Sequence, residues 1–82
     1  MLDLRSIIDQ IKGYDTYSVR NGVIIRRYAL FREEQLPVEE VESWAIYPEM
    51  IFDVVEIKKK NSLSLIWFDY RNDLIGILKS LA

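Results

Sequence analysis

The chain has 82 residues, half of them hydrophobic and 29% charged, which fits one folded domain and is too apolar for intrinsic disorder. It contains no cysteine and no histidine, which excludes a disulfide framework, a thiolate metal site and the commonest general base. The net charge of −2 argues against a nucleic-acid partner. Without a bilayer-spanning apolar stretch or a leader pattern, the chain is expected to be cytoplasmic.

Residues 1–13 are predicted to form a short amphipathic helix, which Asp3 is placed to cap and Gly13 to end. The predicted apolar face consists of Leu4, Ile7, Ile8 and Ile11. The predicted water-facing positions are Arg5, Ser6, Asp9, Gln10 and Lys12. A helix of fewer than three turns is marginally stable alone, so its apolar face is expected to dock on another apolar surface.

Residues 14–68 are predicted to form antiparallel strands, because β-branched and aromatic residues dominate and turn residues separate the runs. Asn21-Gly22 tolerates positive φ angles and predicts a tight hairpin. Leu36-Pro37 interrupts the next stretch, since proline lacks a ladder donor, and pairing is expected to restart near Val41. Five strands are visible, with more expected if the second one bends: 14–20, 23–32, 41–47, 50–60 and 63–68.

The last two predicted strands are apolar on both faces. Alternation places Met50, Phe52 and Val54 on one side, and Ile51, Val55 and Ile57 on the other. In the same way, Leu63, Leu65 and Trp67 lie opposite Ile66 and Phe68. A sheet with one face in water does not show this doubling, so apolar surface is expected to remain for the N-terminal helix or for a second copy of the chain.

The segment 69–82 is predicted to form a second amphipathic helix, whose free N–H groups the Asp69 carboxylate can cap. Its apolar face consists of Leu74, Ile75, Leu78 and Leu81. Gly76 is unfavourable inside a helix, so we expect it to mark a close approach of the helix to a strand.

Three motifs in this order resemble the small bacterial domains of the pleckstrin-homology-like (PH-like) superfold. The segment 17–19 is an aromatic-x-hydrophobic strand end that leads through the turn at Asn21-Gly22 to a second strand. Leu36-Pro37 is a hydrophobic-proline step, with Val41 and Trp44 following at the expected spacing. Finally, the hydrophobic strand 65–68 runs directly into the closing helix.

The resemblance covers residues 14–82 and implies an α+β fold. In it, a strongly bent antiparallel sheet forms a half-barrel whose open end the C-terminal amphipathic helix closes. PH-like domains have seven strands, so the stretch from the second strand to Pro37 would supply the missing ones. The short N-terminal helix is an addition to the core fold. The expected organisation is a single domain over 1–82, with helix 1–13, strands 14–68 and helix 69–82.

Two groups of basic residues are candidates for binding an anionic lipid or a phosphate. Lys58, Lys59 and Lys60 form a predicted hairpin tip, although a solvated tip that discourages edge pairing is the simpler interpretation. Arg26 and Arg27, with Arg20 nearby, lie where eukaryotic PH domains hold phosphoinositides. However, the two-residue turn leaves little room for a headgroup, and alternation places Arg26 and Arg27 on opposite faces of the strand. A membrane surface is therefore not the expected partner.

No catalytic, cofactor-binding or metal-ligating residue is predicted. The glutamates at 33–34, 39–40 and 42 lack the spacing of a calcium loop, and no histidine can activate a serine. The expected function is non-catalytic: an interaction or scaffold module that binds another protein or copies of itself, by default as a closed homo-oligomer. The candidate interface residues are Trp44, Phe52, Trp67 and Phe68. The alternative is a PH-like module that binds anionic lipid or phosphate.

Overall fold

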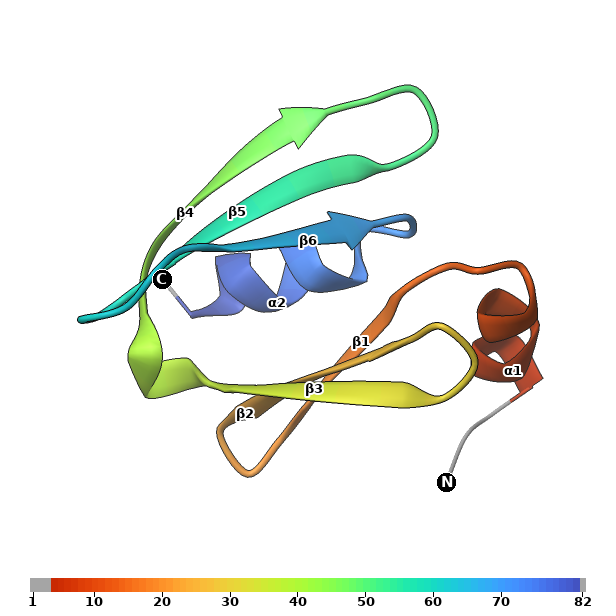
Figure 1. Cartoon of the computed structure of the whole chain (residues 1–82), viewed down its shortest axis with the longest axis horizontal. Helices are drawn as coiled ribbons and strands as arrows, with labels where there is room; N and C mark the ends of the chain where they lie inside the picture. The colour runs from red at the N-terminus through yellow and green to blue at the C-terminus, as the bar shows by residue number, and fades with distance from the viewer. Residues whose placement is uncertain (1–3, 82) are drawn as a thin grey trace.

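A computed structural model describes residues 4–81 and shows an α+β fold of two three-stranded antiparallel sheets and two helices (Figure 1). Sheet A contains β1 (Thr16–Arg20), β2 (Val23–Tyr28) and β3 (Arg32–Pro37), and sheet B contains β4 (Val41–Pro48), β5 (Asp53–Lys59) and β6 (Leu65–Asp69). The short 3-10 helix η1 (Val38–Glu40) joins the sheets, α1 (Leu4–Ile11) precedes them and α2 (Asp73–Ser80) follows them. Neither α1 nor α2 is long and apolar enough to cross a bilayer.

The predicted α+β class, antiparallel pairing and C-terminal helix are confirmed, but the strands form two separate sheets and no closed barrel. The stretch from the second predicted strand to Pro37 supplies one further strand, as expected if that strand bends, so residues 4–81 form six strands where PH-like domains have seven. The predicted strand 23–32 ends at Tyr28, and a further strand, β3, runs from Arg32 to Pro37. Pro37 occupies the last position of β3, where a missing N–H costs the ladder little, and pairing restarts at Val41 as predicted.

The predicted hairpin at Asn21-Gly22 is confirmed. Asn21 and Gly22 have φ angles of 52° and 73°, and Arg20 pairs with Val23 across the turn. Two successive positive φ angles match the twist of the flanking strands, which is why an Asn-Gly pair fixes the register of this hairpin.

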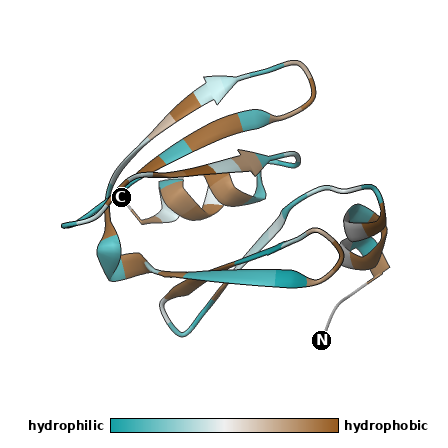
Figure 2. Cartoon of the chain, in the orientation of Figure 1, coloured by the Kyte–Doolittle hydropathy of each residue, from teal (hydrophilic) through white to brown (hydrophobic). Residues whose placement is uncertain are grey.

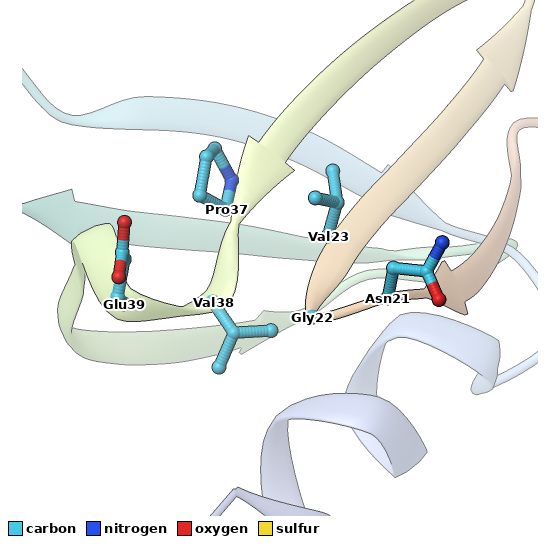
Figure 3. Close-up of a pocket in the computed structure, with 6 residues that line it drawn as sticks. All are labelled: Asn21, Gly22, Val23, Pro37, Val38 and Glu39. Carbon is cyan, nitrogen blue, oxygen red and sulfur yellow. The ribbon is translucent and has the colours of Figure 1, made fainter.

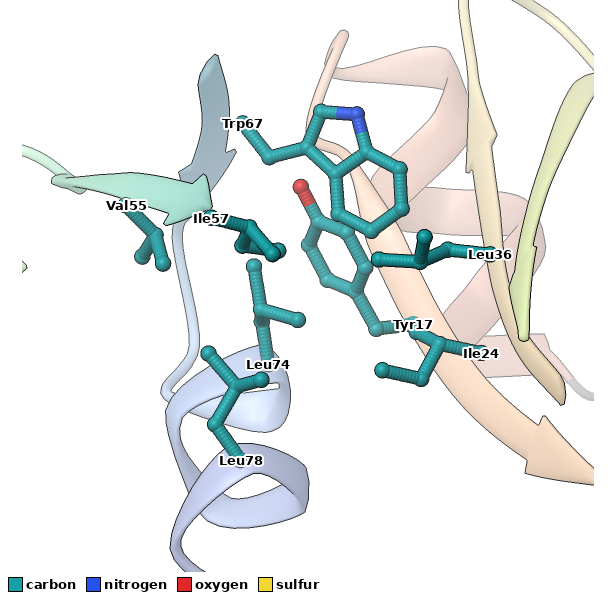
Figure 4. Packing of buried hydrophobic residues seen from close by; sticks show 8 residues of the cluster. All are labelled: Tyr17, Ile24, Leu36, Val55, Ile57, Trp67, Leu74 and Leu78. Carbon is teal, nitrogen blue, oxygen red and sulfur yellow. The ribbon is translucent and has the colours of Figure 1, made fainter. Parts of the chain in front are cut away.

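The core lies between the two sheets and α2 (Figure 4). Leu74 and Leu78 of α2 are fully buried, and Figure 4 shows both pointing toward the side chains of the two sheets. The buried cluster consists of Tyr17, Ile24, Leu36, Val55, Ile57, Trp67, Leu74 and Leu78. One shared core therefore joins two sheets whose strands do not pair with each other.

The start of α2 confirms the predicted role of Asp69. Its Oδ2 accepts a hydrogen bond of 2.8 Å from the backbone N–H of Ile75, which satisfies one free donor of the first helical turn. The prediction for Gly76 was wrong. A Cβ at Gly76 would meet no atom within 4 Å, because the residue faces open space and not a strand.

The docking of α1 reverses the prediction. Leu4 and Ile11 are 72% and 69% exposed, whereas Asp9, predicted to face water, is buried. Asp9 Oδ1 lies 2.7 Å from an Arg71 guanidinium nitrogen. The helix ends at Ile11, two residues before the predicted terminator Gly13, which has a φ angle of 82°. Ion pairing, with a partner 62 residues away in the chain, thus replaces the expected apolar contact. The proposed cap, Asp3, lies outside the described residues.

Candidate interaction surface

The outer face of sheet B, which points away from α2, carries mostly apolar side chains. The cross-strand pairing places two rows of residues on this face. The first row consists of Tyr47, Val54 and Phe68. Ala45, Glu56 and Ile66 form the other. Tyr47 and Ile66 are 52% and 50% exposed, and the other members of both rows are half-buried. We call Ala45, Tyr47, Val54, Ile66 and Phe68 the sheet B patch.

Glu56 is the only charged member of the two rows. It accepts a hydrogen bond of 3.4 Å from the Tyr47 hydroxyl, so part of its charge is balanced within the face. The doubled apolar pattern predicted for strands β5 and β6 is confirmed here, since Val54 and Phe68 lie on the outer face while Val55 and Trp67 lie in the core.

The outer face of sheet A is polar by contrast. Arg27 on β2 forms an ion pair of 3.4 Å with Glu33, its cross-strand neighbour on β3, and Ile25, two residues earlier on β2, is buried. Val23 and Pro37, which pair on the same face, are half-buried, so the large apolar side chains of this face are all buried or half-buried. Ser18 and Arg20 on β1 extend the same polar surface.

The inner face of sheet A holds a part-buried charged cluster beside the core. Arg26 binds Asp15 through two hydrogen bonds of 2.7 and 2.9 Å, and also pairs with Glu34. Burial raises the pKa of Asp15 in spite of Arg26, while the hydrogen bond and charge of Asp15 outweigh burial and raise the pKa of Arg26. The Tyr17 hydroxyl donates a hydrogen bond of 2.6 Å to the carbonyl of Phe68, and burial raises its pKa above the ordinary value.

The structure does not bring the predicted basic residues together. Arg26 is engaged on the inner face of sheet A, Arg27 lies on the outer face, and Lys58 to Lys60 lie at the far end of β5. Lys58 forms a 3.2 Å ion pair with Glu42, and Lys59 is half-buried. No shared anion site therefore forms from these five residues.

The four predicted interface aromatics have different positions. Trp67 is 2% exposed and lies in the core, and Trp44 packs against the core from β4. Phe52 contacts Phe68 edge to face, with ring centroids 5.4 Å apart. Only Phe68 belongs to the sheet B patch. Sequence reasoning found the face but missed Tyr47, although alternation along 41–47 was the signal that could have placed it there.

The surface of residues 4–81 includes two hollows. One, of about 510 Å³, is lined by Asn21, Gly22, Val23, Pro37, Val38 and Glu39, where the first hairpin meets η1 (Figure 3). Its single carboxylate and single amide supply no pair of groups for acid-base chemistry. The other, of about 200 Å³, lies on the outer face of sheet A beside Arg20 and Arg27. Within residues 4–81, no three carboxylates gather into a group that could hold a metal ion.

Comparison with known proteins gives no identification: no protein-family model, no curated protein and no solved structure matches this chain.

Proposed function

We propose that this chain is a non-catalytic interaction module of PH-like type that self-associates through the outer face of sheet B. The PH-like assignment is supported by the strand order and by a C-terminal helix packed on the inner faces of both sheets. The single observation that carries the proposal is the sheet B patch, an apolar surface that spans all three strands while the equivalent face of sheet A is charged.

A second copy of the chain is the occupant that this surface fits best. A two-fold axis can lie between the two faces and run along the row of Tyr47, Val54 and Phe68. This row of one copy then packs on the same row of the other copy, so apolar side chains meet apolar side chains. The Glu56 side chains of the two copies then lie four residue positions apart along the strand direction, about 13 Å. This distance exceeds the Debye length of about 8 Å at physiological salt, so the repulsion between the two carboxylates is largely screened.

The turn between β4 and β5 has a role in the same arrangement. Met50 and Ile51 at this turn are 102% and 71% exposed. The two-fold axis would bring them over the second row of the other copy, where Ile66 is half exposed. This contact would cover the most exposed apolar side chain of the described residues and extend the interface beyond the flat patch.

The size of the face predicts weak association. The seven residues of β5 span about 23 Å and three strands about 14 Å, so each copy offers a flat area of about 320 Å² before the turn is added. Two such faces give only about 640 Å² in total, so the contact reaches the lower limit of about 1,000 Å² for a specific interface only with the turn included. We therefore expect a reversible dimer that forms at protein concentrations on the order of 100 μM.

Sedimentation equilibrium over a concentration series tests this function. Ile66→Lys places a charge in the contact and should weaken dimerisation at least tenfold. Val19→Lys is the matched control, because Val19 is also a strand residue and is 48% exposed, but lies on sheet A. Both variants should keep the wild-type melting temperature. A wild-type chain that stays monomeric, or two variants that weaken the dimer equally, would contradict the proposal.

A further inference from the structure

The N-terminal helix binds the domain through its polar side and presents its apolar side to solvent. Asp9 is held at 2.7 Å by Arg71 and at 3.7 Å by Arg5. The loop after the helix is fixed as well, since the Tyr14 ring stacks on Tyr70 with centroids 4.6 Å apart. These contacts orient the helix so that Leu4, Ile8 and Ile11 are exposed, while Ile7 is half-buried.

The exposed side of α1 has the spacing of a binding face. Leu4, Ile8 and Ile11 follow at intervals of four and three residues and are 72%, 40% and 69% exposed. Side chains at this spacing line one side of a helix. A helix whose orientation is already fixed loses less entropy when that side binds.

A second apolar protrusion lies at the same end of the molecule. Leu30 and Phe31, in the turn between β2 and β3, are 63% and 54% exposed. Figure 2 shows this turn as an apolar segment beside α1, which carries both apolar and polar residues, at one end of the long axis. Ala29, Leu30 and Phe31 all have positive φ angles, of 45°, 58° and 79°. L residues avoid this conformation, and a turn that keeps it while exposing two large apolar side chains indicates a functional constraint.

The charges at this end select the partner. Asp9, the only acidic residue of Leu4–Ile11, is buried and paired with Arg71. Arg5 is exposed but pairs with Asp9 and with Asp73, so Lys12, which follows the helix directly, is the exposed cation on this side. Arg32 follows the apolar turn and is also exposed. Apolar side chains on two separate protrusions, bordered by exposed cations, fit a deformable anionic surface better than a rigid groove.

We infer that this end of the domain, formed by α1 and the β2–β3 turn, binds the surface of an anionic bilayer. Leu4, Ile8, Ile11, Leu30 and Phe31 insert at the level of the headgroups, while Lys12 and Arg32 contact the lipid phosphates or carboxylates. The site differs from the lysine tip considered in the sequence, because Lys58 to Lys60 lie at the opposite end of the long axis (Figure 1). It also does not involve the sheet B patch.

Co-sedimentation with vesicles tests the inference. The full chain should bind phosphatidylcholine vesicles that contain about one third phosphatidylserine, bind pure phosphatidylcholine more weakly, and dissociate as salt is raised. Replacing Lys12→Gln and Arg32→Gln together should weaken binding about fivefold per charge. Replacing Lys58→Gln and Lys60→Gln removes the same charge at the other end and should leave binding unchanged.

The apolar contribution needs its own variant and control. The double variant Leu4→Ser, Ile11→Ser should lose vesicle binding by at least tenfold and keep its melting temperature, because both residues are exposed. Leu63→Ser, at an 87% exposed position in the opposite end, should bind as the wild type does. Failure of the wild type to bind anionic vesicles, or equal losses in the lysine variant, would overturn the inference.

Self-association gives a further check that separates the two proposals. Ile66→Lys should still bind vesicles, and the variant at Leu4 and Ile11 should still dimerise. If the latter variant instead loses the dimer in the absence of lipid, a second copy covers α1 and the membrane inference is wrong.

Discussion

Sheet A and sheet B each contribute an apolar side to the shared core, but their outer faces have opposite chemistry. On sheet A, Arg27 and Glu33 pair across an outer face on which Ile25 is buried and Val23 and Pro37 are half-buried. On sheet B, Tyr47 and Ile66 are half exposed with apolar neighbours. Two sheets of similar size in one chain thus form a natural internal control, in which one outer face is suited to water and the other to a partner.

The inner faces differ as well. Sheet A holds Arg26 with Asp15 and Glu34 beside the core, whereas the inner side of sheet B presents Val55, Ile57 and Trp67. Sheet A therefore depends on charge pairing for part of its stability, and sheet B depends on apolar packing. Substitutions on the two sheets should respond differently to pH and to concentration.

The largest expected effect is on the helix that serves both sheets. Leu78→Ala should lower the free energy of unfolding by about 2 to 4 kcal/mol, because Leu78 is fully buried against the core of both sheets. Leu81→Ala, at a 37% exposed position of the same apolar face, should cost less than half as much. Urea unfolding of the two variants measures the difference, and an equal free energy of unfolding for Leu78→Ala and wild type would exclude the docking of α2.

Removing the cation from sheet A should have the next largest effect. Arg26→Met leaves the Asp15 side chain, 8% exposed, without its main partner and should destabilise the fold by about 2 to 3 kcal/mol. Adding Asp15→Asn should recover part of this loss, since the uncompensated buried charge is then removed. Denaturant unfolding of the single and double variants checks the coupling. Strictly additive losses would show that the two groups act independently.

Tyr17 makes the same region sensitive to alkali. Burial raises its pKa, so the folded state keeps the phenol proton above pH 10, where the unfolded chain releases it. Stability is therefore lost as pH rises past 10, by at most about 1.4 kcal/mol per pH unit from this group. Tyr17→Phe loses a hydrogen bond worth about 1 kcal/mol at pH 8 but should show a shallower alkaline decline. Unfolding measured from pH 8 to 11 compares the slopes; parallel curves would refute the assignment.

The smallest effect is expected on the outer face of sheet A. Arg27→Ala removes an ion pair of 3.4 Å between partly exposed side chains and should change stability by less than about 0.5 kcal/mol. It should also leave the dimer constant unchanged, because this face has no part in self-association. Sedimentation equilibrium and urea unfolding of this one variant check both statements. A weakened dimer would show that the outer face of sheet A takes part in the contact, against the proposal for sheet B.

Local signals in the sequence predicted the parts of the fold that depend on neighbouring residues. Asn21-Gly22 fixed the first hairpin, and Asp69 was correctly expected to cap α2. The turn at Leu30 and Phe31 was not located because neither residue favours a positive φ angle, so the second strand was expected to run through it to Arg32, with a further strand only if it bent.

The docking of α1 could not be predicted because it depends on a distant residue. Periodicity identifies the apolar side of a helix, and burial of that side is the usual outcome. Here the Arg71 guanidinium, beside the first turn of α2, binds Asp9, so the side of α1 that carries Asp9 faces the domain. For the candidate surface, alternation predicted two apolar faces in β5 and β6 but not which one α2 would cover.

A dilution series of two-dimensional amide NMR spectra tests the contrast between the sheets most directly. From the highest to the lowest concentration, the account predicts shifts in the amides of Ala45, Tyr47, Val54, Ile66 and Phe68. The amides of Ser18, Arg20, Ile25 and Arg27 on sheet A should not move. Concentration-dependent shifts confined to sheet A, or spectra that do not change with dilution, would contradict self-association through sheet B.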